Sequence, residues 1–214
     1  MSSAYMRKRE LMDELERISR LLPQRTRLLL IGGAPMVFRE QKDGTIDIDI
    51  VALSERDKTA LENAMRRLGY EKKGKMRFEN PVTKFRIEVD AGKFIRTPIS
   101  SRMLDRAEKR HLKNLELLLL SNEDNVMFKS MTERERDIED IQKIISSTKI
   151  DWNIIYEETK RLTEEEILKK GLDETTLYPA FVAVKLREVK DKYNLIDEKI
   201  ISKFEDLASD FMES

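Results

Sequence analysis

The chain has 214 residues, which is enough to bury a sizeable core as one domain or as two small ones. Lysine plus arginine and aspartate plus glutamate number 41 each, so no global charge predicts a nucleic-acid or membrane partner. The absence of cysteine excludes disulfides, zinc–thiolate sites and thiol nucleophiles. No apolar run approaches the ~20 residues of a membrane helix, and we therefore expect a cytoplasmic protein.

The first 120 residues alternate between helical and strand patterns. Apolar residues at helical spacing predict helices, and short apolar or alternating runs predict strands. The run at 112–120 fits either a strand or a buried helix, and we favour a strand. In chain order, the predicted elements are a helix over 5–22, strands over 28–31 and 45–50, a helix over 55–68, a hairpin of strands over 75–79 and 84–90, a short helix from 100, and the strand over 112–120.

From residue 121 onward every pattern is helical. Capping residues and terminal glycines delimit the helices, and we find neither repeats nor a low-complexity segment. The predicted helices cover 122–131, 133–147, 152–169, 176–193 and 196–212. We therefore predict an α+β protein, in which a domain over 1–120 has a mixed β-sheet with flanking helices and a domain over 121–214 is a C-terminal helical bundle.

The strand over 45–50 carries carboxylates at alternate positions. Because successive side chains of a strand point to opposite faces, Asp47 and Asp49 should share one face with Thr45, while the isoleucines between them face the core. Adjacent like charges are unfavourable unless a cation lies between them, and oxygen ligands favour Mg²⁺ or Mn²⁺. An ordinary half-exposed strand has the same pattern, so this strand alone does not establish a metal site.

Two features could complete such a site. Gly32 and Gly33 follow a buried strand, and their backbone can approach an anion closely, although Gly-Gly is also an ordinary turn. If the arm over 84–90 pairs beside the first carboxylate strand, then Glu88 or Asp90 supplies a third carboxylate; the alternative is a solvated edge strand. Together these patterns predict a phosphate-and-metal site.

Local basic residues bear on a possible RNA partner. One group surrounds the predicted hairpin, and a second forms a stripe if the short helix from 100 extends far enough. Interspersed acidic residues favour the alternative of ordinary solvated faces. The first group is Arg66, Arg67, Lys72, Lys73, Lys75 and Arg77, and the second is Arg102, Arg106, Lys109 and Lys113.

These motifs resemble the DNA polymerase beta-like nucleotidyltransferase superfamily over residues 25–145. The sequence of the carboxylate strand is similar to that of the minimal, antitoxin-linked and abortive-infection branches. The helical half also resembles these branches, because a lysine lies one helix before an Arg-Asp pair. The matching segments are Ile31-Gly32-Gly33, Thr45-Ile46-Asp47-Ile48-Asp49, Ile87-Glu88-Val89, Lys129 and Arg136-Asp137.

The resemblance implies a nucleotidyltransferase-like sheet and a role for each matching residue. Gly32 and Gly33, with Thr45 beside them, would hold nucleotide phosphates. Asp47 and Asp49 would bind two magnesium ions, and Glu88, or Asp90 in its place, would complete that site. Lys129 would neutralise phosphate charge, and Asp137 would order its segment or touch the nucleotide; a surface lysine and a helix-surface charge are the alternatives.

The leading hypothesis is therefore a magnesium-dependent enzyme that transfers a nucleoside monophosphate from a triphosphate such as ATP to a hydroxyl of RNA or protein, in a toxin–antitoxin or defence context. A second hypothesis is a non-catalytic, antitoxin-like protein that binds a toxin chain. A third is a nucleotide-binding protein without turnover. None of them involves a membrane.

Overall fold

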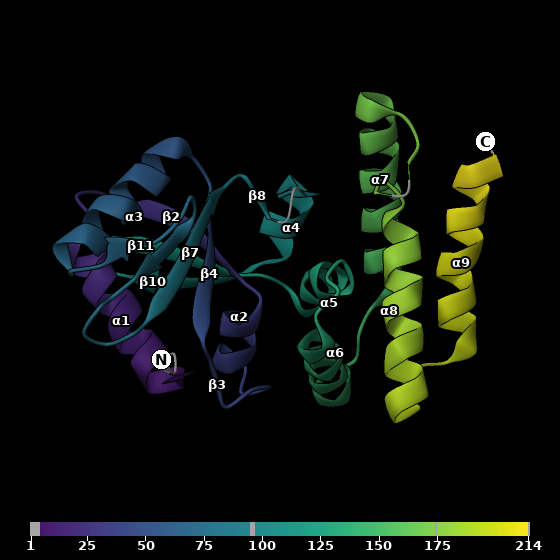
Figure 1. Ribbon diagram of the computed structural model, residues 1–214, viewed down its shortest axis with the longest axis horizontal. Coiled ribbons are helices and arrows are strands. Elements are labelled where there is room, and N and C mark those ends of the chain that lie inside the picture. The colour runs from purple at the N-terminus through teal and green to yellow at the C-terminus, as the bar shows by residue number, and fades with distance from the viewer. Residues whose placement is uncertain (1–4, 95–96, 174, 214) are drawn as a thin grey trace. The chain divides into compact units, whose positions relative to one another are not determined.

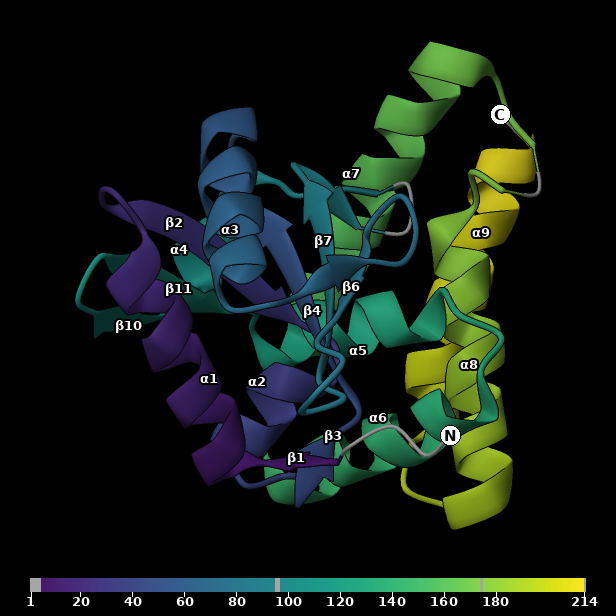
Figure 2. The ribbon, with the colours of Figure 1, turned by 60° about the vertical axis from the view of Figure 1, so that its left-hand side comes forward.

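The computed structural model describes residues 5–94, 97–173 and 175–213. Contacts between residues group the chain into two compact units, Met1–Ser121 and Asn122–Ser214. The first contains a mixed sheet with helices and the second is helical (Figures 1 and 2). This confirms the predicted α+β fold class.

The first unit is built on a sheet that, among the described residues, has seven strands in the order β10-β11-β2-β4-β7-β6-β5. The strands of this sheet are β2 (Thr26–Ile31), β4 (Asp47–Ala52), β5 (Glu71–Lys72), β6 (Arg77–Glu79), β7 (Arg86–Ala91), β10 (Glu108–Leu112) and β11 (Leu115–Leu119). Two small pairs join β1 (Met6–Arg7) to β3 (Gly44–Thr45), and β8 (Lys93–Phe94) to β9 (Thr97–Pro98). The helices are α1 (Lys8–Leu21), α2 (Gly33–Phe38), α3 (Glu55–Arg67) and α4 (Ser101–Arg106).

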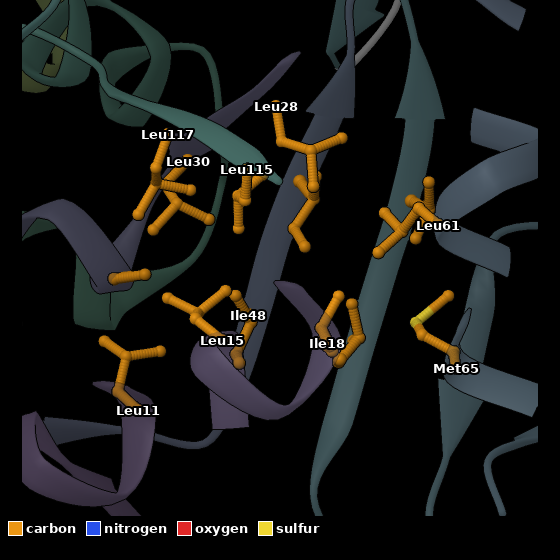
Figure 3. Close-up of a cluster of buried hydrophobic side chains, with 14 of the residues drawn as sticks. Leu11, Leu15, Ile18, Leu28, Leu30, Ile48, Leu61, Met65, Leu115 and Leu117 are labelled. Carbon is orange, nitrogen blue, oxygen red and sulfur yellow. The ribbon is translucent and has the colours of Figure 1, made fainter. Parts of the chain in front are cut away.

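The main core lies between one face of this sheet and the helices α1 and α3. Figure 3 shows the apolar side chains of both helices facing those of the strands. The labelled members are Leu11, Leu15 and Ile18 of α1, Leu61 and Met65 of α3, and Leu28, Leu30, Ile48, Leu115 and Leu117 of the strands. Because Ile48 points into this core, its neighbours Asp47 and Asp49 point to the opposite face.

The second unit consists of helices with apolar faces turned toward one another. They are α5 (Asn122–Ser130), α6 (Glu135–Ser147), α7 (Trp152–Lys170), α8 (Tyr178–Tyr193) and α9 (Glu198–Glu213). The side chain of Asp151 caps α7, which ends at Gly171 in a positive-φ conformation. Helices α8 and α9 lie side by side (Figures 1 and 2). Within the described residues, none of the helices has both the length and the apolar character needed to cross a membrane.

One local prediction was wrong, and the condition for a second was not met. Thr45 is not on the carboxylate strand, because it pairs with Met6 of β1 and the chain bends at Ile46 before β4 begins. The basic stripe from residue 102 does not form either, because α4 ends at Arg106. Residues 108–112 instead form β10, which hydrogen-bonds to the edge of β11.

Candidate functional site

The glycine turn after β2 lies directly against the start of β4. Gly32 has φ +67° and ψ −127°, a backbone conformation that L side chains rarely adopt. A Cβ atom at Gly32 would lie 2.6 Å from Oδ2 of Asp49, and one at Gly33 would lie 2.6 Å from Oγ1 of Thr45. Gly32 therefore requires glycine because of its backbone conformation, whereas a side chain at Gly33 would require Thr45 to shift, and the Asp49 carboxylate faces the turn. Thr45 reaches it as well, although from β3 and not from β4.

The register of β4 and β7 brings the third carboxylate level with Asp49. The strands are parallel, and Asp49 stands opposite Glu88. Residues that are level in neighbouring strands point to the same face, with Cα atoms about 5 Å apart. Asp47, Asp49 and Glu88 are all half-buried and share the face turned away from the main core. The pairing expected from the sequence is therefore present.

Asp90 lies one step further along this face and has a different environment. It is level with Val51, and its Oδ1 accepts a hydrogen bond of 2.8 Å from the backbone N–H of Ala91. Glu88 is thus the acidic residue of β7 that stands beside Asp49, whereas the Asp90 carboxylate is bonded at the end of its own strand. This geometry favours Glu88 as the third carboxylate.

Two arginines complete the rows of charge on this face. Arg86 is flanked in register by Asp47 on β4 and Glu79 on β6, and Arg77 of β6 stands opposite Glu88. The first row thus alternates in sign, whereas in the second Glu88 lies between Asp49 and Arg77. Even so, within the part of the chain that the structure describes, neither guanidinium forms an ion pair, and the Nε atom of each is buried without a hydrogen-bond partner.

The chemistry of the carboxylates suits a hard divalent cation, because Asp47, Asp49 and Glu88 offer only oxygen ligands. Their common face and the Asp49 carboxylate beside Gly32 place these ligands next to a turn that can receive phosphate. Among the described residues, however, no three acidic, histidine or cysteine side chains are gathered closely enough to hold a metal ion. The three carboxylates are therefore suitable ligands for a divalent cation and lie on one face of the sheet. To bind the cation, their side chains would have to move closer together.

Lys129 and Asp137 belong to the second unit, where they contact each other. The Nζ atom of Lys129 donates hydrogen bonds of 2.7 Å to Asp137 and to Asp140, and all three side chains are buried. The hydroxyl of Thr132 also donates to Asp137. The Asp137 carboxylate thus accepts hydrogen bonds from its own segment, and the roles implied for it stay predictions. These contacts do not test whether Lys129 meets a phosphate.

Known proteins resemble this chain in sequence and in fold. The sequence profile of a protein family described as "nucleotidyltransferase of unknown function (DUF6036)" matches residues 9–194. The chain belongs to this family. The DUF6036 match covers the glycine turn, all the carboxylates of the candidate site and the Lys129 segment. No curated protein matches the chain.

A solved structure shares the fold of this DUF6036 protein. It is the crystal structure of an antigenic nucleotidyltransferase-like protein from Paracoccidioides brasiliensis, with a TM-score of 0.55 and 14% sequence identity. The match covers 94% of this chain and 95% of that chain. At this identity the likeness shows the fold alone. The nucleotidyltransferase superfamily is thus supported, whereas the branch within it is not shown.

Sequence reasoning gave no site role to three charged residues of this DUF6036 protein. Asp140 lies one helical turn after Asp137, and that spacing could have indicated a second partner for Lys129. Arg77 was included only in a basic group around the predicted hairpin, and Arg86 was given no role. Their alternation with Glu79 and Glu88 was visible in the sequence, but the register that aligns them with the carboxylates was not.

Proposed function

We propose that this protein is a metal-dependent nucleotidyltransferase that transfers a nucleoside monophosphate from a nucleoside triphosphate to a hydroxyl of RNA or protein. The observation that carries the proposal is the position of Asp49. Its carboxylate lies against the glycine turn, and it is level with Glu88 on the face that also holds Asp47. A turn suited to phosphate and three oxygen ligands therefore occupy one end of the sheet.

Each of these residues has a role in the proposed reaction. The backbone at Gly32 and Gly33 would bind the triphosphate, and Asp47, Asp49 and Glu88 would hold Mg²⁺ or Mn²⁺. When bound, the metal supplies charge neutralisation at the attacking and leaving oxygens. Glu88 would accept the proton of the acceptor hydroxyl as its oxygen bonds to the α-phosphorus. The bond from that phosphorus to the β-phosphate oxygen breaks, and pyrophosphate leaves.

The remaining predictions from the resemblance are parts of the same proposal. Lys129 would neutralise phosphate charge, and ATP is one of the candidate donors. A toxin–antitoxin or defence setting is proposed because the segment from Thr45 to Asp49 resembles those branches. A toxin or antitoxin chain would then be a partner, as a protein that is modified or as one that is bound.

One observation favours a second candidate function, that of a non-catalytic protein with this fold. Among the described residues the carboxylates are not gathered into a metal-binding group. Such a protein would bind a nucleotide or a partner chain without turnover. It would not require Asp47, Asp49 and Glu88 to converge on a cation, and so it differs from the first candidate in its dependence on divalent metal.

The test is calorimetric titration of the full chain with each of the four ribonucleoside triphosphates, with and without magnesium. We expect Asp47→Asn/Asp49→Asn to weaken magnesium-dependent binding by at least about tenfold, since even outer-shell changes at metal sites cost about 10- to 100-fold. Asp13→Asn, on the exposed part of α1, is the matched control and should bind like the wild type. Unchanged binding in the double variant would refute the site.

The role of Glu88 is tested separately by transfer of labelled nucleotide to cellular RNA and protein. Glu88→Gln should abolish transfer while the protein stays folded, because the variant loses both the metal ligand and the proton acceptor. Asp90→Asn should retain transfer, since that carboxylate is bonded to its own strand end. The opposite pattern would assign the third carboxylate to Asp90, and binding without transfer in the wild type would favour the non-catalytic candidate.

A further inference from the structure

The unpaired arginines of the candidate site require an explanation. Buried polar atoms in proteins almost always have a hydrogen-bond partner, because leaving one without a partner costs about 1–3 kcal/mol. Arg77 and Arg86 each bury an Nε atom that has none, although Glu88 is level with Arg77 and two carboxylates flank Arg86 in register. An intramolecular ion pair is therefore not what holds these side chains on this face. A bound anion would supply the missing acceptors.

The arginines lie on the side of the carboxylates away from the glycine turn. The sheet order runs β2-β4-β7-β6, with the turn at the end of β2 and Arg77 on β6. Neighbouring strands are about 4.8 Å apart, so β6 lies about 14 Å across the sheet from β2. An anion at Arg77 is consequently a different group from a phosphate held at Gly32. Glu88 lies between the two positions, level with Asp49 on one side and Arg77 on the other.

The chemistry of the arginines narrows the class of anion. A guanidinium group presents a planar fork of donors that matches phosphate, and two guanidinium groups on adjacent strands can grip one phosphate from two directions. Because Glu88 is the proposed acceptor of the hydroxyl proton, a phosphate beside it belongs to the molecule that carries the hydroxyl. A polynucleotide has both groups in each repeating unit, whereas an unmodified protein has no phosphate.

We propose that Arg77 and Arg86 bind a backbone phosphate of the acceptor and that this acceptor is an RNA. The identification of the bound molecule as the acceptor depends on the proposed function. The anion site itself depends only on the two arginines. The absence of an ion pair distinguishes Arg77 and Arg86 from two basic residues nearby. Lys72 is ion-paired with Glu62, and Lys73 is ion-paired with Glu71, so both already have carboxylate partners.

The experiment measures RNA binding and nucleotide binding on the same preparations of the full chain. The RNA probe is a mixed-sequence, 5′-labelled single strand of about twelve nucleotides, a length in the usual range of single-strand sites, followed by fluorescence anisotropy over a series of salt concentrations. Arg77→Gln/Arg86→Gln is the test variant. Lys72→Gln/Lys73→Gln is the matched control, because it removes the same charge from the adjacent hairpin.

We expect the arginine variant to lose RNA affinity by about tenfold or more, as charged hydrogen bonds are lost. Its salt dependence should become shallower by about 0.7 for each phosphate contact removed. Nucleotide binding should stay within about twofold of the wild type, and the lysine control should bind RNA like the wild type. Arg77→Lys/Arg86→Lys retains the charge without the planar fork and should bind RNA with intermediate affinity, which also guards against misfolding of the glutamine variant.

Several outcomes would overturn the inference. If the wild type does not bind RNA, or if the arginine variant binds it equally well, the proposed RNA site is refuted. A protein acceptor would then be favoured. Loss of nucleotide binding with retained RNA binding would assign the arginines to the triphosphate. If no triphosphate binds but RNA binding depends on the arginines, the proposed transferase function fails and the RNA site stands.

Discussion

Two clusters of charge in this molecule contain similar residues and differ in how their charges are used. In the second unit, Lys129 lies between Asp137 and Asp140 and donates to both. On the sheet of the first unit, Arg77 and Arg86 stand level with Glu88 and Asp47, and none of these four side chains forms an ion pair within the described residues. The first arrangement is complete without a ligand and the second is not.

A third cluster shows that the sheet itself permits cross-strand pairing. Arg27 of β2 is level with Glu116 of the parallel strand β11, and Arg77 of β6 is level with Glu88 of the antiparallel strand β7. In the first pair the contact forms: Nε of Arg27 lies 3.2 Å from Glu116, and Arg25 bonds to the same carboxylate. A level position on neighbouring strands therefore does not by itself prevent such a contact in this sheet. The comparison indicates that paired clusters stabilise this fold, whereas the unpaired cluster is available to bind something else.

The largest expected effect is at Lys129. Lys129→Met would leave two buried carboxylates without their cation, and breaking a buried pair in this way costs about 3–5 kcal/mol. Urea denaturation should show this loss of unfolding free energy. The control is Lys149→Met at an exposed site, which should change stability by no more than about 0.5 kcal/mol. A Lys129→Met protein of near-normal stability that no longer binds nucleotide would instead make Lys129 a ligand-binding residue.

An intermediate effect is expected at Glu116 as the pH falls. Burial raises the pKa of this carboxyl group, but the hydrogen bond from Arg25 and the charges of Arg27 and Arg25 outweigh it, so the pKa lies below its ordinary value of 4.5. A lowered folded-state pKa contributes stability that is present above pH 4.5 and is lost as the pH falls through the folded-state value. Glu116→Gln should therefore be less stable than the wild type at pH 7, by about 1 kcal/mol because the arginines are largely exposed.

The measurement is the unfolding free energy of wild type and Glu116→Gln at a series of pH values from neutral to acidic. The difference between the two proteins should shrink as the pH falls below about 4.5, because the wild-type carboxylate is then neutralised as well. A difference that stays constant over this range would show that the charge of Glu116 does not stabilise the fold, and the paired cluster would lose its value as a reference.

Much of the fold could be predicted because its signals are local. Continuous apolar runs predicted β2 and β11. Helix starts were predicted near 55, 100 and 152, and in the structure the side chains of Ser54, Ser100 and Asp151 cap these helices. The two-residue pair of β1 with β3 and the charged edge strand β10 were not predicted. Such short or solvent-facing strands have no apolar periodicity, and their pairing depends on partners distant in sequence.

The candidate site could be predicted only in part, for a related reason. Alternation predicted that Asp47 and Asp49 share a face, but the residue of β7 that stands beside Asp49 depends on register, which the sequence left open between Glu88 and Asp90. The close approach of Gly32 to Asp49 likewise depends on how two strand ends meet. The unpaired state of Arg77 and Arg86 is a property of three strands together and has no signal in any one of them.

The smallest expected effect tests the comparison most directly. Double-mutant cycles on unfolding free energy would measure the coupling of Arg77 with Glu88 and of Arg27 with Glu116, with glutamine at each position. We expect the second pair to couple by about 0.5–1 kcal/mol, as exposed ion pairs do, and the first by less than about 0.3 kcal/mol. Both pairs join an arginine and a glutamate that are level on neighbouring strands, which are parallel for Arg27 and Glu116 and antiparallel for Arg77 and Glu88.

A coupling of 1 kcal/mol or more between Arg77 and Glu88 would mean that the pair forms in solution. The arginine would then position Glu88, and the case for a separate phosphate site would fail. With weak coupling, the cycle can be repeated in saturating single-stranded RNA. If RNA binds the guanidinium group, Arg77→Gln should then cost more stability than it does without RNA, because a ligand that binds the folded state stabilises the protein in proportion to its affinity.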